Sequence, residues 1–182
     1  MLERLLKPAS QQVEPPGRYR YDEPITKRIR ERDIIISPTV FGALRTAERF
    51  EAMGTVHNPQ DASAIKRLRG RLTNTGHFHR MGIRLVGGTD CGATDTPFDT
   101  FVDELLAYTE AGLSVETVLR IATCQNAELL KLPRVGEIRP GFRADLILVA
   151  ENPLQDLNAL RRPFQVFKSG QLVHEQESTN AN

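Results

Sequence analysis

Residues 83–90, IRLVGGTD, decide the fold class of this chain. The run from Ile83 to Val86 is short and mostly apolar, and two glycines follow it. A short apolar run that is bounded by turn residues is typical of a strand buried on both faces of a parallel sheet. Asp90 then stands at the carboxyl end of this strand, where parallel α/β proteins collect their functional groups.

A second strand of the same kind lies upstream, and helices separate the two. Residues 34–37, IIIS, are apolar and β-branched and stop at a proline. Apolar residues recur at helical spacing in several other segments, and we expect helices over 23–32, 41–53, 62–81 and 98–112, another after Ser114, and one over about 124–131. This alternation of strands and helices predicts an α/β fold with a parallel sheet or barrel.

The chain changes character near Leu132. The stretches GEIRPGFRADLILVA (136–150) and FQVFKSGQLV (164–173) predict short strands, the second with a hairpin turn at Ser169-Gly170. We therefore expect a poorly ordered lead-in over 1–21, the α/β part over 22–132, an all-β part over 133–174, and a disordered tail over 175–182.

Asp90 is the candidate catalytic and metal-binding residue. Gly87 and Gly88 lack side chains, which leaves space beside the carboxylate for an ion or a substrate, and Thr89 can hold the turn by a local hydrogen bond. A carboxylate so placed suits a divalent metal ion, and it can accept a proton from a water whose pKa the ion lowers to about 7. The alternative is that Asp90 only caps the loop or the next helix, as aspartates often do.

Four stretches in order resemble the C-terminal region of the amidohydrolase superfamily, in the branch of imidazolonepropionase and the prolidase-like enzymes. They are Gly88-Thr89-Asp90, TPFDTFVDELLAYTEAGLS (96–114), Ala122-Thr123 with Ala127, and GEIRPGFRADLILVAENPL (136–154). The resemblance covers roughly residues 20–174. It implies a metal-dependent hydrolase on a (β/α)8 TIM barrel, with residues 34–39 in the seventh strand and 83–90 in the eighth. A small β-sandwich, to which residues 133–174 contribute, is joined to the barrel.

The resemblance also implies a role for Asp90. The matching aspartate of the family ligates the metal, takes the proton of the attacking water and hands it to the leaving nitrogen. The implied cofactor is a divalent ion, zinc or a similar metal, and the implied substrate is a small-molecule amide or cyclic amide. The family's other ligands lie on strands that would precede Met1, so we expect an inactive fragment that binds metal poorly by itself.

The four histidines of the chain do not replace those ligands. His77 and His79 form a His-x-His, but they lie where a helix enters a strand at its amino end. Side chains two residues apart on a helix diverge by about 200°. His57 is expected in a loop between helices, and His174 follows the last strand.

A second hypothesis is a non-catalytic half-barrel interaction module or a pseudo-enzyme. Two barrel strands leave open edges, and such edges pair with other chains. The expected partner is a complementary N-terminal half or a second copy of the chain.

Nucleic acid is not an expected partner, although charge is unevenly spread. Residues 1–84 hold 16 Lys and Arg against 9 Asp and Glu, whereas residues 85–182 hold 8 against 14. The basic clusters at 27–32 and 66–71 are more typical of solvated helix faces, which often pair with nearby acids. With no tryptophan and three tyrosines in the chain, there is little for bases to stack on.

Composition indicates a soluble protein of the cytoplasm with no membrane partner. The chain is 40% hydrophobic and 26% charged, and no apolar run approaches the ~20 residues that span a bilayer. The N-terminus, MLERLLKP, is too short and too charged for a secretory signal. Cys91 and Cys124 form no spaced pair, which favours free thiols in a reducing compartment.

Overall fold

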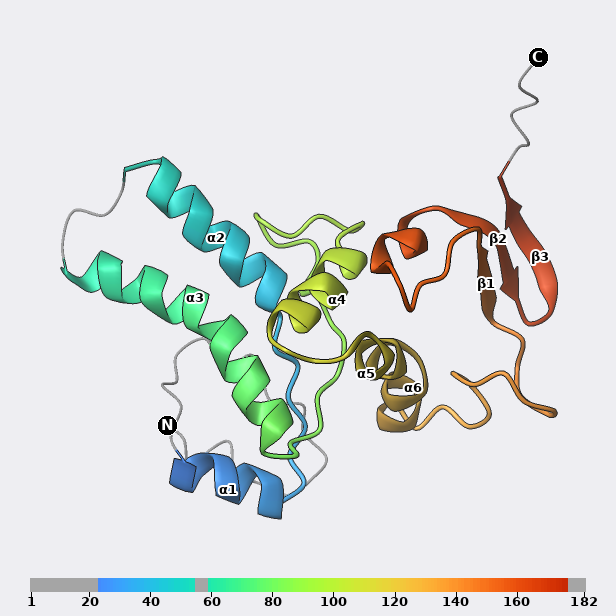
Figure 1. Cartoon of the computed structure of the whole chain (residues 1–182), viewed down its shortest axis with the longest axis horizontal. Helices are drawn as coiled ribbons and strands as arrows, with labels where there is room; N and C mark the ends of the chain where they lie inside the picture. The colour runs from blue at the N-terminus through green and yellow to red at the C-terminus, as the bar shows by residue number, and fades with distance from the viewer. Residues whose placement is uncertain (1–22, 55–58, 177–182) are drawn as a thin grey trace. The chain divides into compact units, whose positions relative to one another are not determined.

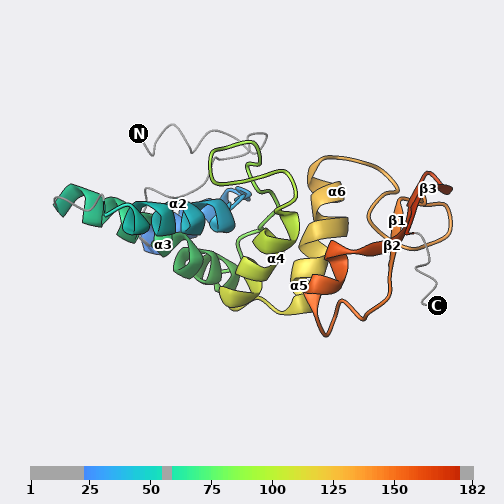
Figure 2. The same cartoon turned by 90° about the horizontal axis from the view of Figure 1, so that it is seen from above.

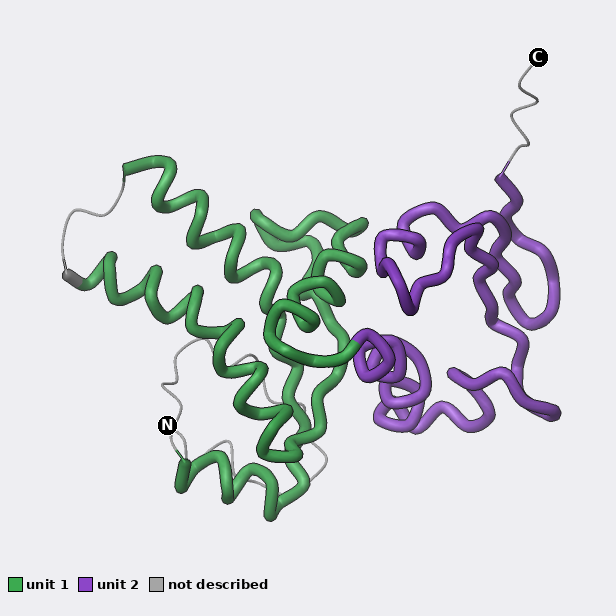
Figure 3. The backbone as a smooth tube through the Cα atoms, viewed as in Figure 1, with its two compact units in different colours: residues 1–114 green, residues 115–182 purple. Residues whose placement is uncertain are grey.

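The computed structural model describes residues 23–54 and 59–176. Its internal contacts group the chain into two compact units, residues 1–114 and residues 115–182, which Figure 3 shows in different colours. The domain boundaries expected from the sequence, at 22–132 and 133–174, stay predictions.

The two expected strands of the first unit lie side by side in the same direction. Ile36 and Leu85 form a parallel bridge, in which Ile36 N donates to Arg84 O and Val86 N donates to Ile36 O, each at 3.0 Å. Ile36 and Leu85 are each 3% exposed. The burial and the parallel pairing that the apolar runs predicted are therefore confirmed.

Helices precede, separate and follow these two strands in the chain, and most helices lie in the expected ranges. They are α1 (Glu23–Glu31), α2 (Val40–Ala52), α3 (Pro59–Arg80) and α4 (Phe101–Glu110). α2 and α3 lie side by side in both views (Figures 1 and 2). α4 begins later than expected, and Phe98, which the helical spacing placed inward, is 83% exposed. Gly112 follows α4 with φ +96°, which suits a residue that ends a helix.

The second unit joins a helical run to a small sheet. α5 (Val115–Arg120), the π-helical segment η2 (Ile121–Gln125) and α6 (Asn126–Leu129) follow one another without a break. The strands β1 (Leu146–Val149), β2 (Pro163–Lys168) and β3 (Gln171–Glu175) form an antiparallel sheet in the order β1-β2-β3, and a 3-10 helix, η3 (Leu157–Arg161), precedes β2. The strands and the Ser169-Gly170 hairpin expected near the C-terminus are confirmed, whereas η3 was not expected.

The fold is mixed α/β, as the sequence predicted. Its first unit contains the parallel strand pair and the longest of the described helices, and its second unit contains the antiparallel sheet. Among the described residues, no helix is long and apolar enough to span a membrane.

Candidate functional site

The two strands of the first unit end at the same side, beside a hollow of about 260 Å³. Thr39 follows the first strand and Asp90 follows the second, and the parallel bridge between the strands gives both the same direction. Residues of α2, of α3 and of the loop that follows the second strand line the hollow, and Thr39 and Asp90 are among them. The hollow is therefore built at the carboxyl ends of parallel strands, where functional groups are expected.

Asp90 lies exposed on the wall of this hollow. Its φ of +56° is in the left-handed region, which aspartate tolerates better than most residues. Thr89 Oγ1 accepts a hydrogen bond from Cys91 N at 3.1 Å, so Thr89 holds the turn as expected. The carboxylate faces solvent at the rim rather than the apolar core, but its metal-binding and catalytic roles stay predictions.

The protein itself fills the space beside Gly88. A Cβ atom on Gly88 would lie 2.9 Å from Ser37 Oγ, which follows the first strand. Gly88 therefore allows the two strand ends to approach each other. The sequence-based expectation that this glycine leaves room for an ion or a substrate needs that correction, because the room is taken by the serine hydroxyl.

Arg71 of α3 brings a half-buried positive charge to the hollow. Its Nη1 donates to Thr39 O at 2.9 Å and to Thr39 Oγ1 at 2.7 Å. Burial lowers the pKa of the guanidinium, while the charges of Glu104 and Asp90 raise it. The sequence reading counted Arg71 with a solvated basic face, and the local pattern gave no signal that this arginine turns inward.

Glu104 and Tyr108 of α4 connect the strand ends to the start of α2. Glu104 is 0% exposed, and its carboxylate oxygens accept hydrogen bonds from Val40 N at 2.8 Å and from Phe41 N at 2.7 Å. Burial raises the pKa of Glu104 more than these bonds lower it. Tyr108 Oη donates to Val86 O at 2.8 Å. Burial, with the nearby Glu104, raises the pKa of Tyr108 well above its ordinary value, so the phenol keeps its proton.

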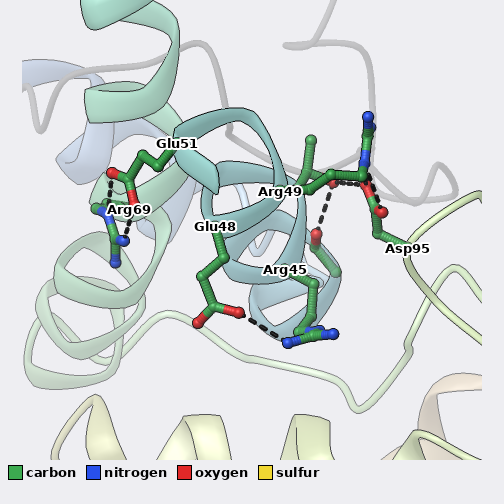
Figure 4. A network of polar contacts seen from close by, with 8 residues as sticks. Arg45, Glu48, Arg49, Glu51, Arg69 and Asp95 are labelled. Carbon is green, nitrogen blue, oxygen red and sulfur yellow. Dashed lines mark hydrogen bonds and ion pairs between the residues drawn. The ribbon is translucent and has the colours of Figure 1, made fainter. Parts of the chain in front are cut away.

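An ion pair holds the loop that follows the second strand against α2 (Figure 4). Asp95 accepts from Arg49 Nε at 2.8 Å and from Thr46 Oγ1 at 2.7 Å, and these bonds lower the pKa of Asp95. The bidentate pair between Arg69 and Glu51 links α3 to α2 in the same way. The walls of the hollow are thus tied to one another by charged contacts.

Two carboxylates line the hollow, Asp90 and Asp95, and Asp95 is already bonded to Arg49 and Thr46. Within residues 23–54 and 59–176, no three side chains of His, Cys, Asp or Glu gather in a way that could hold an ion. A catalytic zinc normally takes three protein ligands, so the donors described here do not complete a site, and Asp90 fits only as one ligand of a shared set.

The His-x-His of residues 77–79 does not add to that set. It lies in the last turn of α3, where Phe78 is buried and His77 contacts Arg80 through its ring Nδ1 at 3.1 Å. The helix directs the two imidazoles apart, as expected. His57 lies outside the described residues.

Comparison with known proteins gives a family and several relatives. The model of the amidohydrolase family matches residues 17–173 of the chain. A 5-methylthioadenosine/S-adenosylhomocysteine deaminase of Halalkalibacterium halodurans is 32% identical over 111 residues, which are 56% of this chain and 24% of the deaminase.

Solved structures match over nearly the whole chain. A Xaa-Pro dipeptidase with bound methionine in its active site superposes with a TM-score of 0.81 at 24% identity, over 96% of this chain and 42% of the dipeptidase. A prolidase candidate from Bifidobacterium longum gives a TM-score of 0.79 at 27% identity, over 94% of this chain and 44% of that one. The chain therefore spans about a quarter of the curated deaminase and less than half of each structure.

Proposed function

The chain belongs to the amidohydrolase family, and from this premise we propose that it works as the C-terminal part of a metal-dependent hydrolase. The bond cleaved is a carbon–nitrogen bond in a small amide or cyclic amide. The family match over residues 17–173 supports the reaction class, since the relatives include a deaminase and prolidase-like proteins.

In this proposal the two paired strands are the last two of a (β/α)8 barrel. Their parallel bridge at Ile36 and Leu85, and the hollow at their carboxyl ends, support that assignment. The sheet of β1, β2 and β3 is then part of the small β-sandwich. The remaining barrel strands come from polypeptide outside the described residues.

The observation that carries the proposal is the exposed carboxylate of Asp90 at the rim of the hollow. Asp90 would hold the divalent ion as one ligand, and its carboxylate would accept the proton of the attacking water and deliver it to the leaving nitrogen. The ion, which we propose is zinc, supplies Lewis-acid activation of the amide when it is bound. The free cysteines Cys91 and Cys124 support a cytoplasmic location.

The test is hydrolysis by the chain, alone and co-expressed with the polypeptide encoded directly upstream of it. The substrates are dipeptides, N-acyl amino acids and cyclic amides, with and without zinc. We expect zinc-dependent release of amine only from the co-expressed pair, and a loss of at least about a hundredfold in kcat/KM in Asp90→Asn. Asp99→Asn is the matched control, because Asp99 is also an exposed aspartate of the loop that follows the second strand.

Full activity in Asp90→Asn would remove the role given to Asp90. Zinc-dependent hydrolysis by the chain alone would show that the described residues need no partner.

The absence of any hydrolysis from both preparations would favour the second candidate, an interaction module. The strand β3 supports this candidate, because it lies at the edge of its sheet and its five residues are exposed. Size-exclusion chromatography separates the two: a module is expected to elute as a complex with its partner or with itself, while a clean monomer with a cooperative melt argues against it.

A further inference from the structure

The hollow beside Asp90 is lined by two arginines that differ in how they are paired. Arg49 is neutralised by Asp95 at 2.8 Å. Within residues 23–54 and 59–176, Arg71 bonds to the backbone and hydroxyl oxygens of Thr39, both through Nη1. Its Nε is buried and has no hydrogen-bond partner within the described residues. Arg71 therefore keeps its charge without a bonded counter-ion in the part of the chain that the structure describes.

The acidic groups near Arg71 act on it only through their charge. Glu104 and Asp90 both stabilise the guanidinium by Coulomb attraction. The two oxygens of Glu104 are already engaged by Val40 N and Phe41 N. Asp90 is exposed, so water screens its charge. A partly buried cation with unused donors is stabilised when an oxyanion bonds to it.

We propose that Arg71, with the hydroxyls of Thr39 and Thr96, forms an oxyanion subsite that receives the carboxylate or phosphate of a ligand beside Asp90. All three side chains line the same hollow of about 260 Å³. That volume is several times the ~30 Å³ of one water, so an oxyanion and the group that carries it fit together. Both N–H bonds of Nη1 are taken by Thr39 and Nε is buried, so Nη2 is the guanidinium nitrogen left to donate to the oxyanion, beside the threonine hydroxyls.

This inference deepens the proposed function and, for its substrate class, rests on it. A carboxylate held at Arg71 directs the rest of the molecule along the hollow towards Asp90. The substrate is then an amide with a negatively charged end, such as an N-acyl amino acid or a dipeptide. A phosphate at the same place makes the ligand a phosphorylated compound or free phosphate instead.

The experiment measures binding, not turnover, on the full 182-residue chain. Isothermal titration at constant ionic strength is done with N-acetylglycine, with inorganic phosphate and with the neutral N-acetylglycinamide. The variants are Arg71→Gln, Arg71→Lys and the control Arg67→Gln. Arg67 lies on the same helix, is exposed and bonds only Ser63 Oγ at 2.9 Å.

For the wild type we expect saturable binding of one or both anions and no binding of N-acetylglycinamide. Arg71→Gln should bind the anions at least tenfold more weakly, whereas the affinity of Arg67→Gln should stay within twofold of wild type. Arg71→Lys keeps the charge but loses the planar guanidinium that Thr39 orients, so an intermediate affinity is expected. If Arg71→Gln does not fold, Arg71→Lys and the comparison of N-acetylglycine with N-acetylglycinamide on the wild type still test the subsite.

The subsite is overturned if the Arg71 variants bind the anions as tightly as wild type does. It is also overturned if N-acetylglycine and N-acetylglycinamide bind equally well, or if neither anion shows saturable binding. Binding of phosphate alone keeps the subsite but overturns the anionic amide as substrate. Asp90→Asn separates this inference from the proposed function. The variant chain is expected to bind the anion at least as tightly as wild type, while its co-expressed pair loses hydrolysis, and a tenfold loss of anion affinity in Asp90→Asn contradicts the assignment to Arg71.

Discussion

Replacing Glu104 with glutamine tests the connection between α4 and the start of α2. The carboxylate accepts one hydrogen bond on each oxygen, from Val40 N and Phe41 N, and is 0% exposed. An amide of the same shape has one acceptor oxygen, and its NH2 group faces the second N–H as another donor. One backbone N–H is then buried without an acceptor, which costs about 1–3 kcal/mol.

Removing the charge works in the opposite direction, because burial is the largest influence on the pKa of Glu104 and disfavours its ionised form. This relief offsets only part of the loss, and we expect Glu104→Gln to lower the free energy of unfolding by about 2 kcal/mol. For a chain of this size the midpoint of thermal unfolding then falls by roughly 4–8 °C. Glu110→Gln is the matched control, since Glu110 is exposed on the same helix, and it should change stability by less than about 0.5 kcal/mol.

The loss of stability in Glu104→Gln changes with pH in a direction that the raised pKa of Glu104 determines. Burial raises the pKa of Glu104 above its ordinary value in the folded state, so the folded state binds more protons than the unfolded state between the unfolded and the folded pKa. The stability that Glu104 contributes is fully present below the unfolded pKa and is lost as the pH rises through the folded pKa. The difference between wild type and Glu104→Gln should therefore shrink from acidic to neutral pH in urea titrations followed by circular dichroism. A difference that grows with pH, or a variant as stable as Glu110→Gln, refutes this account of the buried carboxylate.

Two further predictions concern single positions in each unit. Gly70 and Gly76 both lie on α3, and alanine adds a Cβ atom to each. At Gly70 this atom meets nothing within 4 Å, whereas at Gly76 it meets the carbonyl oxygen of Ala111. In thermal unfolding, Gly70→Ala should stabilise by about 0.5–1 kcal/mol and Gly76→Ala should destabilise by about 1–2 kcal/mol, and equal effects would contradict the packing of α3 against the end of α4. In the hairpin between β2 and β3, Ser169 and Gly170 have φ of +52° and +80°. Ser169→Asn should stabilise by a few tenths of a kcal/mol and Gly170→Ala should destabilise by about 1 kcal/mol, and the reverse order would exclude the two-residue turn.

Much of the fold could be read from local patterns. The apolar runs around Ile36 and Leu85 predicted buried strands, and the helical spacing predicted α1, α2 and α3 within a few residues. These elements follow from local rules, because a buried strand needs a continuous apolar run and a surface helix needs one apolar face. Phe98 was misplaced since an apolar residue just ahead of a helix continues the periodicity without belonging to the helix.

The polar parts of the candidate site could not be read in the same way. Asp90 was found because it follows a strand, which is a local signal. Arg71 and Glu104 have ordinary charged neighbours, and their burial depends on Thr39 and on the backbone of Val40 and Phe41, far away in sequence. A buried charge is acceptable only where distant partners satisfy it, and a single sequence does not show those partners.

The parallel bridge between Ile36 and Leu85 also affects how the first unit folds. The chain must close a long loop before these residues meet, and contacts between distant residues form slowly because the entropy of closure is lost first. α2 and α3, which fill that loop, can pair beforehand and bring its ends together. During synthesis on the ribosome, the segment that ends at Thr39 therefore waits for its partner until Val86 has left the exit tunnel, and α4, which bonds the ends of both strands through Glu104 and Tyr108, can join them only later still.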